Sequence, residues 1–321
     1  MTFTAQVKDD LTRVACTRGC CRQAELAAFF RFGGNIHIGS RQSIALSMNT
    51  ENAAVARRIF ALSRSLGLKA ELATHRRDRL KKNQVFSLIV RNNAQVEPLL
   101  ATMGIMDASM MLNRDFPGRF NEDIISNDCC RRAFIRGAFL ASGSVSNPEG
   151  AYHLEIIVRD QRLAALLRQL LIEFDINANI TTRKDVYIVY LKSGEQISSM
   201  LNLMGSHRSL LEFESMRVDK EMRNRVNRLV NCEEANLDKT VAAAMRQIAM
   251  IHHLQATKGL GCLPPSLLEV AQLRLDHPDA SLSELSEISH IGRSAINHRF
   301  RRLMNIAEGL HKGQYTKRNS E

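Results

Sequence analysis

The sequence CCRQAELAAFFRFGGNI, residues 20–36, has a close counterpart in CCRRAFIRGAFLASGSV, residues 129–145. Both copies share the double cysteine, the next arginine, an alanine, a phenylalanine and a glycine at matching positions. Their apolar periodicity predicts a buried helix that ends at the shared glycine. An internal repeat determines the architecture, because each copy forms the same supersecondary unit.

The segments that follow these two helices also share one pattern. Ile44, Leu46 and Met48 alternate with polar residues after the first helix, and Leu154 and Ile156 do so after the second. This alternation predicts strands, and the segments between the strand pairs have the apolar spacing of helices. Each copy, at about residues 17–104 and 126–205, therefore predicts helix, strand, strand, helix, strand, strand, helix. Together they form one pseudo-two-fold α+β domain at residues 17–206.

The repeated helices resemble those of the LAGLIDADG homing endonucleases, at LAAFFRFGG (residues 26–34) and IRGAFLASG (residues 135–143). In that fold the two helices meet at the pseudo-two-fold axis, where small residues allow close approach of the backbones. Ala28 and Gly137 occupy those positions in this sequence. The resemblance implies a LAGLIDADG-like domain with two sheets that straddle duplex DNA.

The catalytic positions of that fold lack their acids in this sequence. The nucleases carry one carboxylate at the end of each helix, because divalent metals prefer anionic oxygen ligands. Those positions are Gly33 and Ser142 here, and the acids nearest Gly33 are Glu25 and Glu51. We therefore expect no catalytic residues, no bound metal and no cofactor. An active LAGLIDADG-type nuclease and a maturase-like RNA-binding protein are the enzymatic and RNA-binding alternatives.

Longer segments resemble the WhiA family of bacterial regulators, in which a degenerate LAGLIDADG domain precedes a helix-turn-helix. The matching segments are residues 129–156, 223–248, 263–285 and 296–303. The resemblance implies a transcription regulator of cell division and chromosome segregation, and of sporulation genes in sporulating species, with a WhiB-type co-regulator as partner. The turn between Glu284 and Ser294 is shorter than in the family and lacks its proline pair.

The C-terminal third has the pattern of a helical linker followed by an all-α helix-turn-helix domain. We expect the linker at residues 207–262 and the DNA-binding domain at residues 263–311, with its DNA-binding segment at about 280–313. A capping box, in which Ser281 precedes Glu284 by three residues, predicts a short helix through about Ile288. A third helix follows from about Arg293 to Met304, and residues 312–321 are expected to be a disordered tail.

The third helix has one face for burial and one for contact. Leu268, Ala271 and Leu275 are expected to line the first helix of this domain, and Ile296, Phe300 and Leu303 the third. The opposite face of the third helix is polar and basic, as in a recognition helix of the major groove, although a solvated helix face is the alternative. The predicted DNA-binding residues are Arg293, Ser294, Asn297, His298, Arg301 and Arg302.

Two other basic segments are expected to contact phosphates, which position a protein on DNA without reading its sequence. The loop of residues 75–84 joins two strands of the first repeat, and a solvated loop is the alternative. The predicted phosphate contacts are Arg76, Arg77, Arg79, Lys81 and Lys82 in this loop, and Lys312 and Lys317 in the tail.

Composition supports the same class of function. The chain has 44 Lys and Arg against 33 Asp and Glu, a net charge of +11, which favours a polyanionic partner. It has neither an apolar run long enough for a membrane span nor a nucleotide-binding loop, so we expect neither membrane nor small-molecule binding. The double cysteines lack the CxxC spacing of metal sites and are interpreted as small buried residues at the helix starts.

These observations predict a non-enzymatic, sequence-specific protein that binds double-stranded DNA. We expect it to be cytoplasmic and associated with the nucleoid, with its seven cysteines reduced. A non-specific nucleoid-associated protein remains as an alternative within this class.

Overall fold

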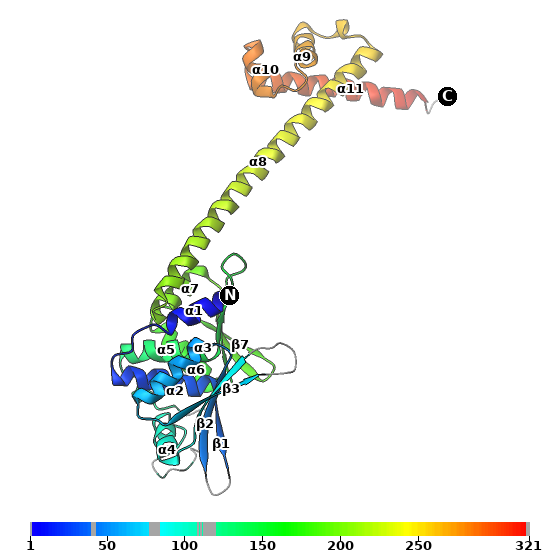
Figure 1. The fold of residues 1–321 in the computed structure, drawn as a ribbon. Helices are drawn as coiled ribbons and strands as arrows, with labels where there is room; N and C mark the ends of the chain where they lie inside the picture. Colours follow the sequence, from blue (N-terminus) through cyan, green and yellow to red (C-terminus); the bar gives the residue numbers. More distant parts are fainter. Residues whose placement is uncertain are drawn as a thin grey trace. The chain divides into compact units, whose positions relative to one another are not determined.

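A computed structural model describes residues 2–39, 43–76, 84–107, 109, 111 and 120–318. The chain divides into two units, residues 1–221 and residues 222–321 (Figure 1). Among the described residues, every helix is either too short or too polar to serve as a membrane span.

Both repeats of the first unit have the predicted order of elements (Figure 1). The first comprises α2 (Gly19–Gly33), β1 (Gly34–Ile38), β2 (Ile44–Thr50), α3 (Ala53–Ser65), β3 (Ala70–Arg76), β4 (Gln84–Val90) and α4 (Asn93–Thr102). After a 3-10 turn, the second comprises α5 (Asp128–Ser142), β5 (Gly143–Val145), β6 (Leu154–Val158), α6 (Gln161–Ile172), β7 (Asn179–Arg183), β8 (Val186–Leu191) and α7 (Gly194–Met204). The predicted α+β class is confirmed.

Each repeat forms one antiparallel sheet of four strands. The strand orders, β1-β2-β4-β3 and β5-β6-β8-β7, are equivalent. Leu46 pairs with Val90 in the first sheet and Leu154 with Leu191 in the second, and all four side chains are buried in one core. Alternate residues of a strand point to opposite faces, so this register gives each sheet one face in the core.

Helices α2 and α5 lie side by side in the middle of this unit (Figure 1). A Cβ added at Gly137 would lie 2.5 Å from the carbonyl oxygen of Glu25 and 2.8 Å from the Cβ of Ala28. No larger residue fits at Gly137 unless the helices separate. The close crossing at Ala28 and Gly137, which the sequence predicts, is therefore present.

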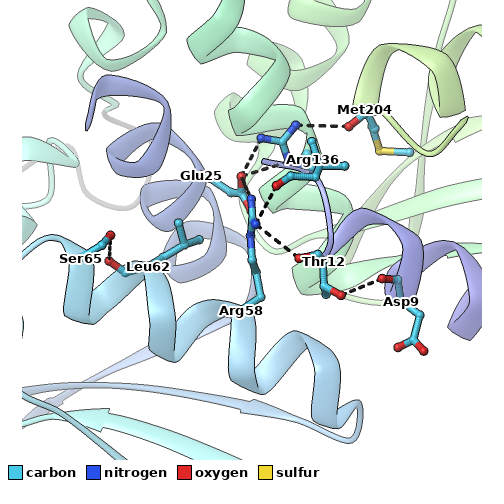
Figure 2. Close-up of polar contacts among 9 residues, drawn as sticks. Asp9, Thr12, Glu25, Arg58, Leu62, Ser65, Arg136 and Met204 are labelled. Carbon is cyan, nitrogen blue, oxygen red and sulfur yellow. Dashed lines mark hydrogen bonds and ion pairs between the residues drawn. The ribbon is translucent and has the colours of Figure 1, made fainter. Parts of the chain in front are cut away.

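A buried carboxylate joins three helices at this crossing. Glu25 on α2 is fully buried, and its two oxygens accept hydrogen bonds from Arg58 on α3 and Arg136 on α5 (Figure 2). Arg58 donates from Nε at 2.8 Å and from Nη2 at 3.0 Å. Arg136 donates from Nη2 at 2.7 Å and from Nε at 3.0 Å. The carboxylate is the counter-charge of both guanidinium groups.

The same two arginines also donate hydrogen bonds to backbone carbonyl groups. Arg58 donates to the carbonyl oxygen of Val14 at 2.7 Å and to that of Thr12 at 3.3 Å. Arg136 donates to the carbonyl oxygen of Met204, at the end of α7, at 3.2 Å (Figure 2). The network therefore extends from the N-terminal segment to the end of the second repeat.

An N-terminal helix that was not expected from the sequence completes the first unit. Helix α1 (Phe3–Leu11) buries Val7 and both of its terminal residues, which follow the spacing of one helix face. Its Asp10 carboxylate accepts a hydrogen bond from the backbone N–H of Ser209 at 3.1 Å. The predicted domain start at residue 17 therefore leaves out part of this core.

Helix α8 (His207–Thr257) forms most of the segment that was expected to be a linker, residues 207–262. Phe213 near its start is buried in the core of the first unit, 6.1 Å from the ring of Phe3. Ile251 and Leu254 near its end are buried in the core of the second unit. The two ends of α8 are thus parts of the two cores.

The second unit contains the three helices of a helix-turn-helix domain, α9 (Pro265–Asp276), α10 (Leu282–Ser289) and α11 (Arg293–Arg318). Two predictions for this domain are wrong in detail: the buried face of its first helix and the length of its third helix. The buried face of α9 carries Leu267, Val270 and Ala271, whereas Leu268 and Leu275 are only half-buried. The buried face begins at Leu267 instead of the predicted Leu268, and it includes Arg274 instead of Leu275. Arginine is usually exposed, so the sequence did not indicate that Arg274 is part of the core.

The third helix of this domain is longer than predicted. It continues past Met304 to Arg318, so residues 312–318 of the expected disordered tail are helical. Ala307 extends the buried row of Ile296, Phe300 and Leu303 by one more turn, which explains why the helix does not end at Met304.

Arg274 connects the helices of this core. Its Nε donates to Oε1 of Gln247 on α8 at 3.0 Å, and Nη1 donates to the carbonyl oxygens of His277 and Ala280. Its guanidinium carbon lies 5.5 Å from the ring centre of Phe300 on α11. These contacts fix the turn between α9 and α10.

Replacement of Glu25 by glutamine tests the role of the buried carboxylate. Glu25→Gln preserves the shape of the side chain but leaves Arg58 and Arg136 without a counter-charge. We expect the free energy of unfolding of the first unit to fall by about 3–5 kcal/mol. Urea unfolding followed by circular dichroism measures this change.

Glu71→Gln is the matched control, because Glu71 and its partner Arg91 are both more than half exposed. Exposed ion pairs contribute little to stability, so this variant should unfold at the urea concentration of the unaltered protein. If Glu25→Gln unfolds at that same concentration, the network does not stabilise the fold.

Candidate nucleic-acid interface

A capping box at the start of α10 and a tight turn after its end determine where helix α11 begins. The backbone N–H of Ser281 donates to Glu284 Oε2 at 2.6 Å, and the N–H of Glu284 donates to Ser281 Oγ at 3.3 Å. The predicted capping box is confirmed. Hydrogen bonds from the backbone and side chain of Ser281 lower the pKa of Glu284. Helix α10 ends at Ser289, and the φ of 55° at its C-cap, His290, turns the chain toward the start of α11.

Helix α11 has the two predicted faces. Ile296, Phe300 and Leu303 are buried, and Asn297 is half-buried at the border between the faces. The other five predicted DNA-binding side chains are exposed: Arg293, Ser294, His298, Arg301 and Arg302. One side of α11 therefore presents polar and basic groups to solvent.

The arginines of α11 differ in whether their charge is paired. Arg299 donates from Nη1 to Glu269 Oε2 on α9 at 2.8 Å, so it belongs to the packing of the domain. Among the described residues, Arg293, Arg301 and Arg302 form no ion pair. These three guanidinium groups remain available for an anionic or hydrogen-bonding partner. The sequence pattern alone did not separate Arg299 from them.

The predicted phosphate contacts remain predictions. Arg77, Arg79, Lys81 and Lys82 lie outside the described residues. Arg76 ends strand β3, and Lys312 and Lys317 lie on α11, but the structure describes none of these three side chains.

The ends of α2 and α5 carry no carboxylate. Gly33 is the last residue of α2, and a Cβ there would lie 3.0 Å from Cε of Met48 and 3.3 Å from Cβ of Ala141. Ser142 is the last residue of α5, and its hydroxyl donates to the carbonyl oxygen of Ala138 at 3.5 Å. Larger side chains would crowd the Gly33 position.

A cavity of about 310 Å³ lies beside the end of α2, with Arg31, Asn35, Arg159 and Asp160 in its lining. Asp160 is the N-cap of α6 and accepts a hydrogen bond from the N–H of Leu163 at 2.8 Å. Burial lowers the pKa of Arg31, and the Asp160 carboxylate opposes that shift. The carboxylate that lines this cavity, that of Asp160, therefore already caps α6. Nuclease chemistry requires a pair of carboxylates.

The N-terminal ends of α2 and α5 bring four cysteines together. The Sγ atoms of Cys20, Cys21, Cys129 and Cys130 all lie within 4.8 Å of one another. The cysteines were expected to be small buried residues at the helix starts, but Cys20 is exposed and Cys129 half-buried. The pairs meet because equivalent ends of the two helices lie side by side, which the spacing within either pair does not reveal.

The four thiols differ in environment. Hydrogen bonds from Cys21, Arg18 and Cys130 lower the pKa of Cys129. Burial raises the pKa of Cys21 to about 12, and it also raises that of Cys130. The Arg18 Nη1 atom lies 3.7 Å from the Cys129 sulfur.

Comparisons with known proteins agree with this arrangement along the chain. Three family models match it: the WhiA N-terminal LAGLIDADG-like domain at residues 19–106, the WhiA LAGLIDADG-like domain at 131–223 and the WhiA C-terminal HTH domain at 226–307. The helix-turn-helix and the degenerate repeat thus have counterparts in one family.

Similar whole proteins carry the same name. A probable cell division protein WhiA of Heliobacterium modesticaldum is 45% identical over 313 residues, 97% of each chain. One from Desulforamulus reducens is 45% identical over 317 residues, 98% of each chain. The crystal structure of full-length DUF199/WhiA from T. maritima has 26% identity and a TM-score of 0.56, covering 96% of this chain and 98% of that one.

Proposed function

The chain belongs to the WhiA family, and on that premise we propose that it is a non-enzymatic regulator that binds double-stranded DNA sequence-specifically. Helix α11 enters the major groove and reads base edges. The first unit serves as a scaffold that keeps the LAGLIDADG-like fold without its nuclease chemistry.

The exposed, unpaired arginines of α11 are the observation that carries this proposal. An arginine fork matches the two acceptors of guanine, and an asparagine matches the donor and acceptor of adenine. Arg301 is exposed on the side of α11 away from the buried Ile296 and Phe300, and Asn297, one helical turn before it, is half-buried at the border of that side. Their side chains reach a base edge without disturbing the core.

The absence of acids at Gly33 and Ser142 supports the non-enzymatic part of the proposal. Metal-dependent cleavage of DNA requires anionic oxygen ligands beside the scissile phosphates. Neither helix end supplies one, and the nearby Asp160 caps another helix.

The relatives are named probable cell division protein WhiA, which supports a role in cell division. We propose that this role extends to chromosome segregation, and to sporulation where the organism forms spores. It acts as a transcription regulator in the cytoplasm, on the nucleoid, with a WhiB-type co-regulator. Non-specific coating of the nucleoid is the second candidate, which the net charge of +11 favours.

Genome-wide chromatin immunoprecipitation distinguishes these two roles. A sequence-specific regulator occupies discrete promoters that share one motif, because correct base contacts add to the affinity for phosphates. We therefore expect sharp peaks with a common motif. A uniform distribution that follows only DNA content would contradict sequence-specific regulation and support a nucleoid-coating role.

Substitutions on α11 test which residues read the DNA. We expect Asn297→Ala and Arg301→Ala each to weaken binding to a specific site by about 1–3 kcal/mol and to relax base preference there. Lys317→Ala should weaken binding to all sequences alike and lower the salt slope by about one unit. Fluorescence anisotropy with specific and scrambled duplexes measures both effects.

Arg299→Ala is the matched control for these variants, because Arg299 lies on the same helix but pairs with Glu269. It should retain base preference, and circular dichroism should show all variants folded. The assignment to α11 is wrong if neutralising the loop of residues 76–82 abolishes specific binding while Arg301→Ala changes neither affinity nor base preference.

A cleavage assay tests the non-enzymatic part. We expect no nicking of plasmid that contains a bound site, with either Mg²⁺ or Mn²⁺, because the helix ends supply no metal ligands. Agarose gels of supercoiled plasmid detect a single nick. Metal-dependent nicking that co-purifies with the protein and is lost in Ser142→Ala would overturn this conclusion.

A further inference from the structure

We propose that Cys20, Cys21, Cys129 and Cys130 bind one zinc ion that joins the N-terminal ends of α2 and α5. Their sulfur atoms lie within 4.8 Å of one another, and those of Cys129 and Cys130 are 3.9 Å apart. Zinc–sulfur bonds of about 2.3 Å in a tetrahedron place the sulfurs about 3.8 Å apart. The four thiols are therefore close to the arrangement that one ion requires.

The donor set favours zinc over other metals. Four thiolates without oxygen ligands form the tetrahedral S₄ environment typical of structural zinc, whereas Mg²⁺ and Ca²⁺ require oxygen. The nearest acid in sequence, Asp128, is exposed and paired with Arg131 at 3.1 Å. An iron–sulfur cluster distributes its four thiolates over two or four irons, which separates the sulfurs more widely than one ion does.

The charge of such a centre is compensated by its surroundings. Binding of Zn²⁺ by four thiolates displaces the thiol protons to solvent and leaves a net charge of −2. Arg18 Nη1 lies 3.7 Å from the Cys129 sulfur. Its guanidinium group stabilises a negative centre.

The helix starts add to this compensation. The first N–H groups of a helix have no partner within it and carry partial positive charge. The N-cap residues of α2 and α5, Arg18 and Asn127, form no side-chain hydrogen bond to these groups. The N-terminal ends of α2 and α5 therefore both favour thiolates in the first turn of the helix.

An ion can reach the cluster from solvent. Cys21 and Cys129 line a surface cavity of about 400 Å³, together with Arg132 and His207. Cys20 is exposed on the protein surface. The site is thus open to metal exchange while two of its four thiols remain buried.

The zinc site has a structural role distinct from DNA reading. Each repeat contributes one cysteine pair, so the ion links the two repeats at the helix ends opposite Gly33 and Ser142. Loss of the metal should loosen the N-terminal ends of the pair without removing the recognition face of α11.

Metal analysis of the full chain tests this proposal. The protein is purified under reducing conditions without chelator, supplied with Zn²⁺, desalted and measured by elemental mass spectrometry. We expect one zinc per chain, and its loss in the double variant Cys20→Ser/Cys129→Ser. These two positions are the exposed and the half-buried members of the cluster, so their substitution disturbs the core least.

The double variant Cys232→Ser/Cys262→Ser is the matched control, because both of these cysteines are exposed and outside the cluster. It should retain the zinc of the unaltered protein. With Co²⁺ instead of zinc, the control should show the thiolate charge-transfer and visible bands of a tetrahedral sulfur site, and the cluster variant should not. Circular dichroism verifies that both variants are folded.

Three results would overturn the proposal. The protein has no such site if all seven thiols react with Ellman's reagent after zinc is supplied and no metal remains bound. The metal lies elsewhere if the cluster variant keeps its zinc. The cluster is a redox-active group of cysteines instead of a metal site if peptide mapping of freshly purified protein finds its cysteines joined as disulfides.

Discussion

The close approach of α2 and α5 at Gly137 is the constraint on which the first unit depends. With no side chain at Gly137, the backbone of α5 approaches the Glu25 carbonyl, and equivalent residues of the two repeats meet along the helix pair. The buried Glu25 carboxylate then reaches Arg136 of the other repeat, while Arg58 ties the N-terminal segment to the same charge. One crossing thus determines both the shape of the core and its internal charge balance.

At both ends of this helix pair, equivalent parts of the two repeats come together. The residues that meet at the C-terminal ends differ in chemistry from those that meet at the N-terminal ends. The C-terminal ends meet at Gly33 and Ala141, which form a packing contact, and neither end residue is an acid. The N-terminal ends meet at the cysteine pairs, where four sulfur atoms converge. We assign recognition of DNA to α11, whose buried residues belong to the core of the second unit.

Features encoded in short segments could be predicted from the sequence. The burial of Ile296, Phe300 and Leu303 and the capping box at Ser281 each follow from spacing within one element, and the repeat follows from the similarity of two short segments. Helix α1 was missed although its apolar residues have the same helical spacing, because no repeat or motif drew attention to it.

Features that depend on pairing between distant segments could not be predicted. Glu25 stands where the second repeat has Phe134, so the repeat gave no reason to expect a buried acid. Its partners Arg58 and Arg136 are defined only when three helices pack together. The pairing of Arg299 with Glu269, which separates it from the unpaired arginines of α11, likewise requires the packed structure.

Photocrosslinking of the full-length protein to its bound DNA tests the separation of scaffold and reader most directly. Duplexes with photoreactive bases at each position of a bound site are irradiated, and the crosslinked peptides are identified by mass spectrometry. The account predicts crosslinks from the bases of the motif to the exposed side of α11, at or beside Asn297 and Arg301. Crosslinks of those bases to the strands of the two sheets, with none on α11, would contradict it.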